Sequence, residues 1–183
     1  MRTSTLGILL CGSLMIGGCA THQYTVLEPP KKELTDYRVL EIHEFTSNLG
    51  DAESNELADR FAGRLYENVM RDRTAEPEKI VFEQVVRQTN QVDDVLVLDG
   101  AVISYDKGSR AARYFVGLGY GKAHCTIQTT FSDKQTGEVI LKTNFDGELS
   151  MGVFGGSADE AVQGVVTAYL DYFDDYFETH LDD

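Results

Sequence analysis

The stretch KAHCTIQTTFSDKQTGEVILKTNFDGEL, residues 122–149, contains two runs of alternating apolar and polar side chains around the turn-like segment 133–137. In the first run, the apolar or small residues of one face are Ala123, Cys125, Ile127, Thr129 and Phe131. In the second run, they are Val139, Leu141, Thr143, Phe145 and Leu149. A period of two is typical of strands with one buried and one wet face, and a short connection favours antiparallel pairing. The pattern therefore predicts a hairpin of two long strands, about 114–132 and 138–149.

Three further strands are expected upstream of this hairpin. Residues 37–45 have alternating character, with Leu40 and Ile42 on one face and Val39 on the other. Residues 80–86 form a second apolar run. Residues 95–105 are apolar on both faces until Asp99, which is typical of a central strand.

Two amphipathic helices complete the expected elements. Apolar residues recur every four positions over about 54–73, and Pro77 lies just beyond. A broad apolar and aromatic stripe predicts a last helix over about 158–180, with Ser157 and Glu160 in the spacing of a capping box. The order β-α-β-β-β-β-α indicates one α+β domain. We expect a mixed, largely antiparallel sheet of about five strands, with both helices packed on its dry face.

The N-terminus indicates export and lipid anchoring. Arg2 precedes an apolar run over 6–16 that is too short to be a permanent membrane span. Residues 16–20, IGGCA, then resemble a bacterial lipobox, which implies cleavage between Gly18 and Cys19 and acylation of the Cys19 thiol. The alternative is an ordinary cleaved secretory peptide. The prediction is a signal peptide over 1–18 and an anchor at Cys19 whose acyl chains each add about 0.8 kcal/mol per buried methylene.

The segment after the anchor is interpreted as a tether. Residues 19–35 comprise the lipidated cysteine and a flexible stretch with Pro29-Pro30, which spans at most roughly 50 Å. A single periplasmic domain is expected over 36–183. In the sorting logic that the lipobox implies, Ala20 favours the periplasmic face of the outer membrane.

Charge excludes several partners. The formal net charge of the chain is −14, and loss of Arg2 with the signal peptide makes it −15. Such an acidic surface repels nucleic acid and anionic head groups, so we expect no nucleic-acid partner and membrane attachment only through the lipid.

The glycine-rich segment YFVGLGYGKA, residues 114–123, superficially suggests a nucleotide loop. A P-loop fails at both ends, because Val116 stands where its first glycine is required and Ala123 where its hydroxyl is required. A dinucleotide fingerprint fails at Lys122, and a strand pattern follows instead of a helix. No nucleotide or cofactor is therefore expected.

The same segment is a candidate contact surface. Its glycines share the parity of the dry face, where another element of the protein or a partner can approach the backbone closely. On the opposite face we expect partner contacts, with charged residues at the rim. The predicted contact residues are Arg110, Arg113, Val116, Leu118 and Tyr120.

The sequence contains no clear pattern for metal binding or catalysis. The four histidines are scattered without metal-ligand spacing, so no metal is expected. Cys125 and His124 point to opposite faces of a strand and cannot act as a nucleophile and its base; Cys125 is predicted to be a buried thiol. The acidic residues between Asp171 and Asp183 lack the spacing of a calcium loop. No constellation predicts catalysis.

Residues 100–157 read GAVISYDKGSRAARYFVGLGYGKAHCTIQTTFSDKQTGEVILKTNFDGELSMGVFGGS. They contain G-x-[IV]-x-x-[YF], then R-Y-x-V-G-x-G-x-G-x-A, then D-x-x-T-G-E-V and a Gly-Gly-Ser. These motifs resemble the signature region of a bacterial lipoprotein family known as domain of unknown function four-four-one-zero, and the resemblance covers about 36–180. The family has no established activity, so the resemblance implies a place in the envelope and no mechanism. A more distant similarity, to the periplasmic domain of the curli-secretion lipoprotein, implies work in envelope assembly.

These observations favour a non-enzymatic lipoprotein whose domain binds an envelope protein or associates with itself in assembly or export. The alternative is a protein that binds a small ligand or glycan between the aromatic residues of the last helix and the sheet.

Overall fold

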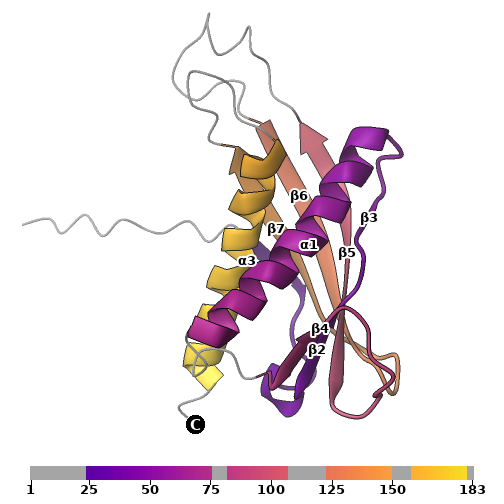
Figure 1. Cartoon of the computed structure of the whole chain (residues 1–183), viewed down its shortest axis with the longest axis vertical. Helices are drawn as coiled ribbons and strands as arrows, with labels where there is room; N and C mark the ends of the chain where they lie inside the picture. Colours follow the sequence, from indigo (N-terminus) through magenta and orange to yellow (C-terminus); the bar gives the residue numbers. More distant parts are fainter. Residues whose placement is uncertain (1–23, 76–81, 107–122, 150–157, 181–183) are drawn as a thin grey trace, which may run out of the picture.

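The computed structural model describes residues 24–75, 82–106, 123–149 and 158–180, which form one α+β unit (Figure 1). Its strands are β1 (Tyr24–Glu28), β2 (Val39–Ile42), β3 (Thr46–Ser47), β4 (Gln84–Val86), β5 (Val95–Asp106), β6 (Ala123–Asp133) and β7 (Val139–Leu149). Its helices are the short 3-10 helix η1 (Leu34–Asp36) and the long helices α1 (Ala52–Ala75) and α3 (Ala158–His180). The predicted fold class is confirmed, with additional short strands.

The sheet is mixed, in the order β1-β7-β6-β5-β2-β4, with β3 paired to β5. The pairs β1–β7, β7–β6 and β6–β5 are antiparallel, whereas β2 is parallel to both β4 and β5, and β3 is parallel to β5. The predicted antiparallel hairpin is confirmed, and in it Thr129 pairs with Thr143 and Ile127 with Phe145. Residues 114–122 of the predicted strand lie outside the described residues.

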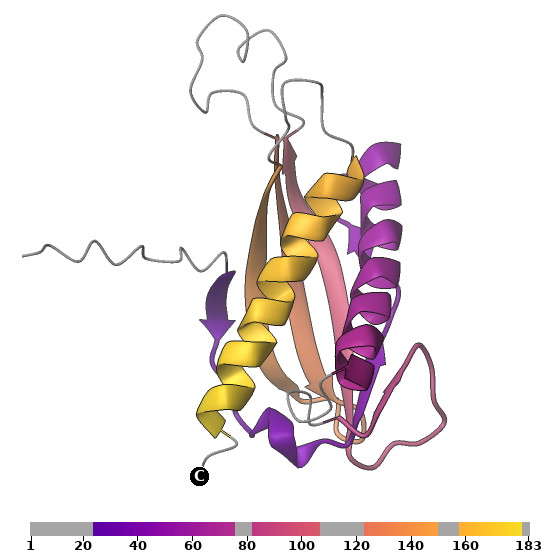
Figure 2. The ribbon, with the colours of Figure 1, turned by 60° about the vertical axis from the view of Figure 1, so that its left-hand side comes forward.

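Helices α1 and α3 both lie on one face of the sheet (Figure 2). Their apolar stripes and the apolar side chains of the strands form the main core, which includes the fully buried Phe61, Phe131 and Tyr169. Rings interlock between α3 and the sheet: Tyr169 lies 4.5 Å from Phe145 and 4.9 Å from Phe173 between centroids. Such contacts add to the stabilisation from apolar burial.

The turn between β6 and β7 is held by Asp133. Its Oδ1 accepts hydrogen bonds from the backbone nitrogen of Thr136, at 2.9 Å, and from the Thr136 hydroxyl, at 3.0 Å. Gly137 has a φ of 71°, in the left-handed region where glycine carries no steric cost. Hydrogen bonds, from the Thr136 backbone first and then from Lys32, Thr136 and Tyr37, outweigh burial and lower the pKa of Asp133 to about 2.

Gly100 allows an aromatic ring to lie against the middle of β5. A Cβ atom added there would stand 2.1 Å from a ring carbon of Phe45. Phe45 is buried and packs on Phe61 of α1, with centroids 5.2 Å apart. Gly100 therefore permits a close contact between the sheet and the segment that leads into α1.

The predicted tether over 19–35 is wrong in its second part. Residues 24–28 form β1, which pairs with β7, and the backbone nitrogen of Lys31 donates to the carbonyl oxygen of Ile140 at 3.0 Å. Leu34 is fully buried, and its backbone nitrogen donates to the Tyr176 hydroxyl of α3. Pairing of β1 with β7 and burial of Leu34 hold this segment against the rest of the domain, despite the two prolines at 29 and 30. Residues 24–35 therefore belong to the domain.

Candidate functional site on the uncovered face of the sheet

The face of the sheet opposite the two helices is the candidate functional surface. Within the described ranges no helix covers it, as both views show (Figures 1 and 2). Because successive side chains of a strand alternate between faces, residues adjacent to the core positions point here. Its central part is formed by Thr126, Gln128 and Thr130 of β6, Lys142, Asn144 and Asp146 of β7, and Asp99 of β5.

Cross-strand hydrogen bonds order the polar side chains on this face. The Thr126 hydroxyl donates to Asp146 Oδ1 at 2.6 Å, and Gln128 Nε2 donates to Asn144 Oδ1 at 3.2 Å. His124 Nε2 lies 3.5 Å from the same Asp146 oxygen. Since these side chains are held before any partner arrives, less conformational entropy would be lost when the surface is bound.

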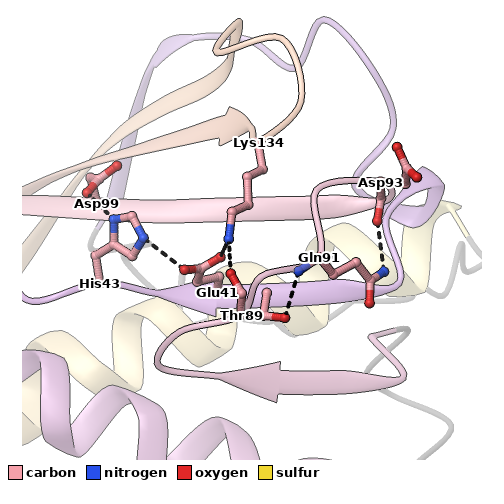
Figure 3. Close-up of polar contacts among 7 residues, drawn as sticks. All are labelled: Glu41, His43, Thr89, Gln91, Asp93, Asp99 and Lys134. Carbon is pink, nitrogen blue, oxygen red and sulfur yellow. Dashed lines mark hydrogen bonds and ion pairs between the residues drawn. The ribbon is translucent and has the colours of Figure 1, made fainter.

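A buried carboxylate, Glu41 of β2, is the centre of a polar cluster at one end of this face (Figure 3). Its side chain is only 3% exposed and forms an ion pair with Lys134, which reaches it from the turn after β6. Lys134 also donates to the carbonyl oxygen of Thr89, which links the connection before β5 to the cluster. Beside Glu41, Val39, Val95 and Val97 form a second, small apolar cluster that shields the ion pair.

The ionised form of Glu41 is favoured by its partners. Burial acts to raise its pKa, but hydrogen bonds from Lys134 and His43 and the charge of Lys134 outweigh burial, so the pKa lies below its ordinary value. Breaking a buried pair leaves an uncompensated charge, so the lysine and the glutamate depend on each other. The pair therefore fixes the geometry of the turn against β2 and the loop before β5.

His43 extends the cluster toward solvent. Its Nδ1 lies 2.9 Å from Asp99 Oδ1, and its Nε2 lies 3.2 Å from Glu41 Oε1. Two carboxylates orient the imidazole, as in acid–base sites. In the described part of the chain, however, no hydroxyl or thiol group is hydrogen-bonded to His43, so a nucleophile and base pair is not assembled there.

The described ranges contain neither a cluster of metal ligands nor a membrane-spanning helix. Within them, no group of three or more histidine, cysteine, aspartate or glutamate side chains is arranged to hold a metal ion. None of their helices is long and apolar enough to cross a membrane.

The predictions for Cys125 and His124 are confirmed. Cys125 is a free, buried thiol, and burial, with a smaller contribution from Asp146, raises its pKa to about 12. A thiol with so high a pKa is a poor nucleophile at neutral pH. His124 lies on the opposite face, beside Asp146. The other predicted site residues, at 18–19 and 110–120, lie outside the described residues.

The predicted ligand space between the last helix and the sheet is filled by side chains. Phe131 packs against Tyr169 and Phe173, and Phe145 packs against Tyr169 and Tyr172. The Tyr169 hydroxyl is buried there without a hydrogen-bond partner. These aromatic residues therefore serve the core.

Sequence reasoning missed the cluster around Glu41. The signal was present in the strand itself, because Glu41 and His43 share the parity of Val39 and place charge on a strand next to buried valines. Lys134 is 93 residues away from Glu41 in the chain, and no local pattern connects the two.

Residues 41–151 match the family model described as "Domain of unknown function (DUF4410)", and the chain belongs to this family. The resemblance predicted from residues 100–157 is thus confirmed, whereas the distant similarity to the curli-secretion lipoprotein stays a prediction. No curated protein sequence matches the chain.

Two solved structures align with most of the chain. The PelC dodecamer from Paraburkholderia phytofirmans aligns at a TM-score of 0.50 and 12% identity, covering 80% of this chain and 96% of that one. Lipoprotein GNA1162 from Neisseria meningitidis aligns at a TM-score of 0.36 and 12% identity, covering 75% of this chain and 96% of that one. At 12% identity, the likeness to PelC concerns the fold alone.

Proposed function

We propose that this DUF4410 protein is a lipid-anchored envelope protein whose domain works by binding other proteins, copies of itself or an envelope partner, and not by catalysis. Cys19 is the proposed anchor, and Ala20 favours the outer membrane. The observation that carries the proposal is the uncovered face of the sheet, where Gln128, Asn144 and Asp146 are held in place by cross-strand hydrogen bonds without belonging to the core.

Strand parity in the sequence is the basis for choosing the contact residues. In the described part of β6, Cys125 and Ile127 are buried in the main core, whereas Thr126 and Gln128 lie on the uncovered face. Counting back in steps of two from Thr126 gives Leu118 and Tyr120. We therefore propose that these two residues and Val116, with Arg110 and Arg113 as charges at the rim, extend the binding surface.

Self-association is the first form of binding to test. PelC, which shares the fold at a TM-score of 0.50, is a dodecamer. A domain that has one ordered, uncovered sheet face can present the same surface to a neighbouring copy or to a second protein.

A pull-down from cross-linked cells tests the proposal. The double variant Leu118→Asp and Tyr120→Asp should abolish the recovered complexes and leave circular dichroism unchanged, because charge is placed on the proposed contact surface and not in the core. Leu49→Asp is the matched control, since Leu49 is a 40% exposed leucine on a connection outside this face. If the double variant recovers the same complexes as the wild type, the assignment of the contact surface is wrong.

The anchor is tested separately. Cys19→Ser should stop incorporation of labelled palmitate and release the protein into the soluble periplasmic fraction. Continued retention in the membrane fraction would contradict the lipid anchor and leave the binding surface as an independent question.

A further inference from the structure

Strand β1 begins close to the proposed lipid anchor. Tyr24, its first residue, is five positions after Cys19, and five residues of extended chain span at most about 17 Å. The head-group layer on each side of a bilayer accounts for roughly 5–8 Å of that length. In the anchored protein, Tyr24 would therefore stand no more than about 10 Å above the head groups.

The domain cannot lengthen this connection without losing part of its fold. Tyr24 pairs with Phe145 of β7, and its ring lies 5.0 Å from that of Tyr172 in α3. Further along, the backbone nitrogen of Lys31 is bound to the Ile140 carbonyl oxygen. Detaching β1 would break these contacts, so β1 is kept near the bilayer by its place in the sheet.

The surface of β1 suits an interfacial position. Four large hydrophobic side chains are exposed in the described part of the chain, and two of them are adjacent on this strand: Val26, 41% exposed, and Leu27, 44% exposed. β1 is an edge of the sheet, at the left of the ribbon in Figure 2. Apolar side chains at such an edge can enter the boundary between head groups and acyl chains.

Local charge does not oppose this contact. Residues 24–33 carry two glutamates and two lysines, so the segment has no formal net charge in a strongly acidic chain. Lys31 lies 4.0 Å from Glu28, which pairs two of these charges. The charges of this segment therefore add nothing to the repulsion expected between the whole protein and anionic head groups.

The same edge is less suited to pairing with a strand of another protein than to contact with lipid. The register of β1 shifts between Val26 and Glu28, and Pro29-Pro30 follows at once. A bulge, a short strand and adjacent prolines are the features by which edge strands avoid pairing with another chain. A lipid surface needs no backbone register.

We propose that β1 is a membrane-resting edge, with Val26 and Leu27 among the lipid head groups, an inference that rests on the proposed anchor at Cys19. The sheet then stands on the bilayer by this edge. Its uncovered face and its helical face both remain open to the periplasm, so anchoring does not obstruct the proposed binding surface.

Lipid quenching of site-specific labels tests this arrangement. The purified, lipidated full-length protein is placed in phosphatidylcholine vesicles that contain spin-labelled head groups, with an environment-sensitive fluorophore on Val26→Cys or on Leu27→Cys. Cys125 is buried and serves as the unlabelled background thiol. Val92→Cys is the matched control, because Val92 is 46% exposed and lies on the connection between β4 and β5. The strands that this connection joins, β5 and β4, are three and five strand spacings from β1 in the sheet order, at least about 14 Å.

Labels at positions 26 and 27 should lose at least about half of their fluorescence in quencher vesicles, and the label at 92 should keep its intensity. Flotation with the vesicles, measured on the same samples, separates the two proposals. Protein that floats while the labels at 26 and 27 stay unquenched overturns the membrane-resting edge alone. Failure of the lipidated protein to float, or flotation of Cys19→Ser, would instead contradict the anchor.

Discussion

The two faces of the sheet differ in what their side chains contact. On the face under α1 and α3, Phe131 and Phe145 are fully buried among the rings of the last helix. On the uncovered face, Gln128 and Asn144 contact each other across the strands and remain partly exposed. The first face provides most of the apolar burial that stabilises the fold, and the second, apart from the small cluster of Val39, Val95 and Val97, is ordered without contributing much to that burial. This difference separates residues that determine stability from residues free to serve binding.

The largest contrast is expected between Phe131→Ala and Gln128→Ala, two positions three residues apart on opposite faces of β6. Phe131→Ala should lower the free energy of unfolding by about 3–5 kcal/mol, because it leaves a cavity beside Tyr169 and Phe173. Gln128→Ala removes one partly exposed hydrogen bond and should cost less than about 1 kcal/mol. Urea unfolding followed by circular dichroism measures both. Equal losses of unfolding free energy in the two variants would contradict the proposed difference between the two faces.

The next largest loss of stability is expected at the close contact between Gly100 and Phe45 on the covered face. Gly100→Ala should cost about 3 kcal/mol, because the new Cβ would meet the ring of Phe45. The double variant Gly100→Ala with Phe45→Leu should be less destabilised than the sum of the two single variants, since the smaller side chain relieves the overlap. Strict additivity in urea unfolding would contradict the contact.

The uncovered face has one position where stability should also depend on charge. Glu41→Gln leaves Lys134 without its buried partner and should cost about 2 kcal/mol, less than a fully buried pair because Lys134 is 20% exposed. Asp99→Asn, at a 54% exposed partner of His43, is the control and should change stability by less than about 1 kcal/mol.

The same pair predicts a pH dependence. The pKa of Glu41 is lowered in the folded protein, so its stabilising contribution is complete above the ordinary pKa of 4.5 and is lost as the pH falls through the folded value. The gap in stability between wild type and Glu41→Gln should therefore narrow below pH 4.5. A gap that widens with acid would show that the sign of the pKa shift is wrong.

The smallest effect concerns a buried hydroxyl on the covered face. Tyr169→Phe should leave stability unchanged or raise it by up to about 1 kcal/mol, because the Tyr169 hydroxyl is buried without a hydrogen-bond partner. Tyr37→Phe is the matched comparison, since the Tyr37 hydroxyl donates to Asp133 at 3.0 Å, and its loss should destabilise by about 1.5–3 kcal/mol. Thermal unfolding of both variants distinguishes them, and a marked loss in Tyr169→Phe would reveal an overlooked partner.

Local periodicity explains what could be predicted from sequence. The hairpin and the bounds of α3 follow from repeating patterns within single segments, and the separation of Cys125 from His124 follows from strand alternation. Strand β1 was missed because Pro29-Pro30 indicates a break and its partner β7 is more than a hundred residues away. Its YTVL run of aromatic and β-branched residues was the available signal. The link between Glu41 and Lys134 depends on tertiary structure and has no local pattern.

Site-specific photo-cross-linking in intact cells tests most directly the claim that the uncovered face is the binding surface. A photoreactive residue replaces Gln128 on that face or, as a control, Gln163, an exposed glutamine on α3. Cross-linked products, to a second copy or to an envelope protein, are expected from position 128 and none from position 163. Products from position 163 alone, or equal products from both positions, would contradict it.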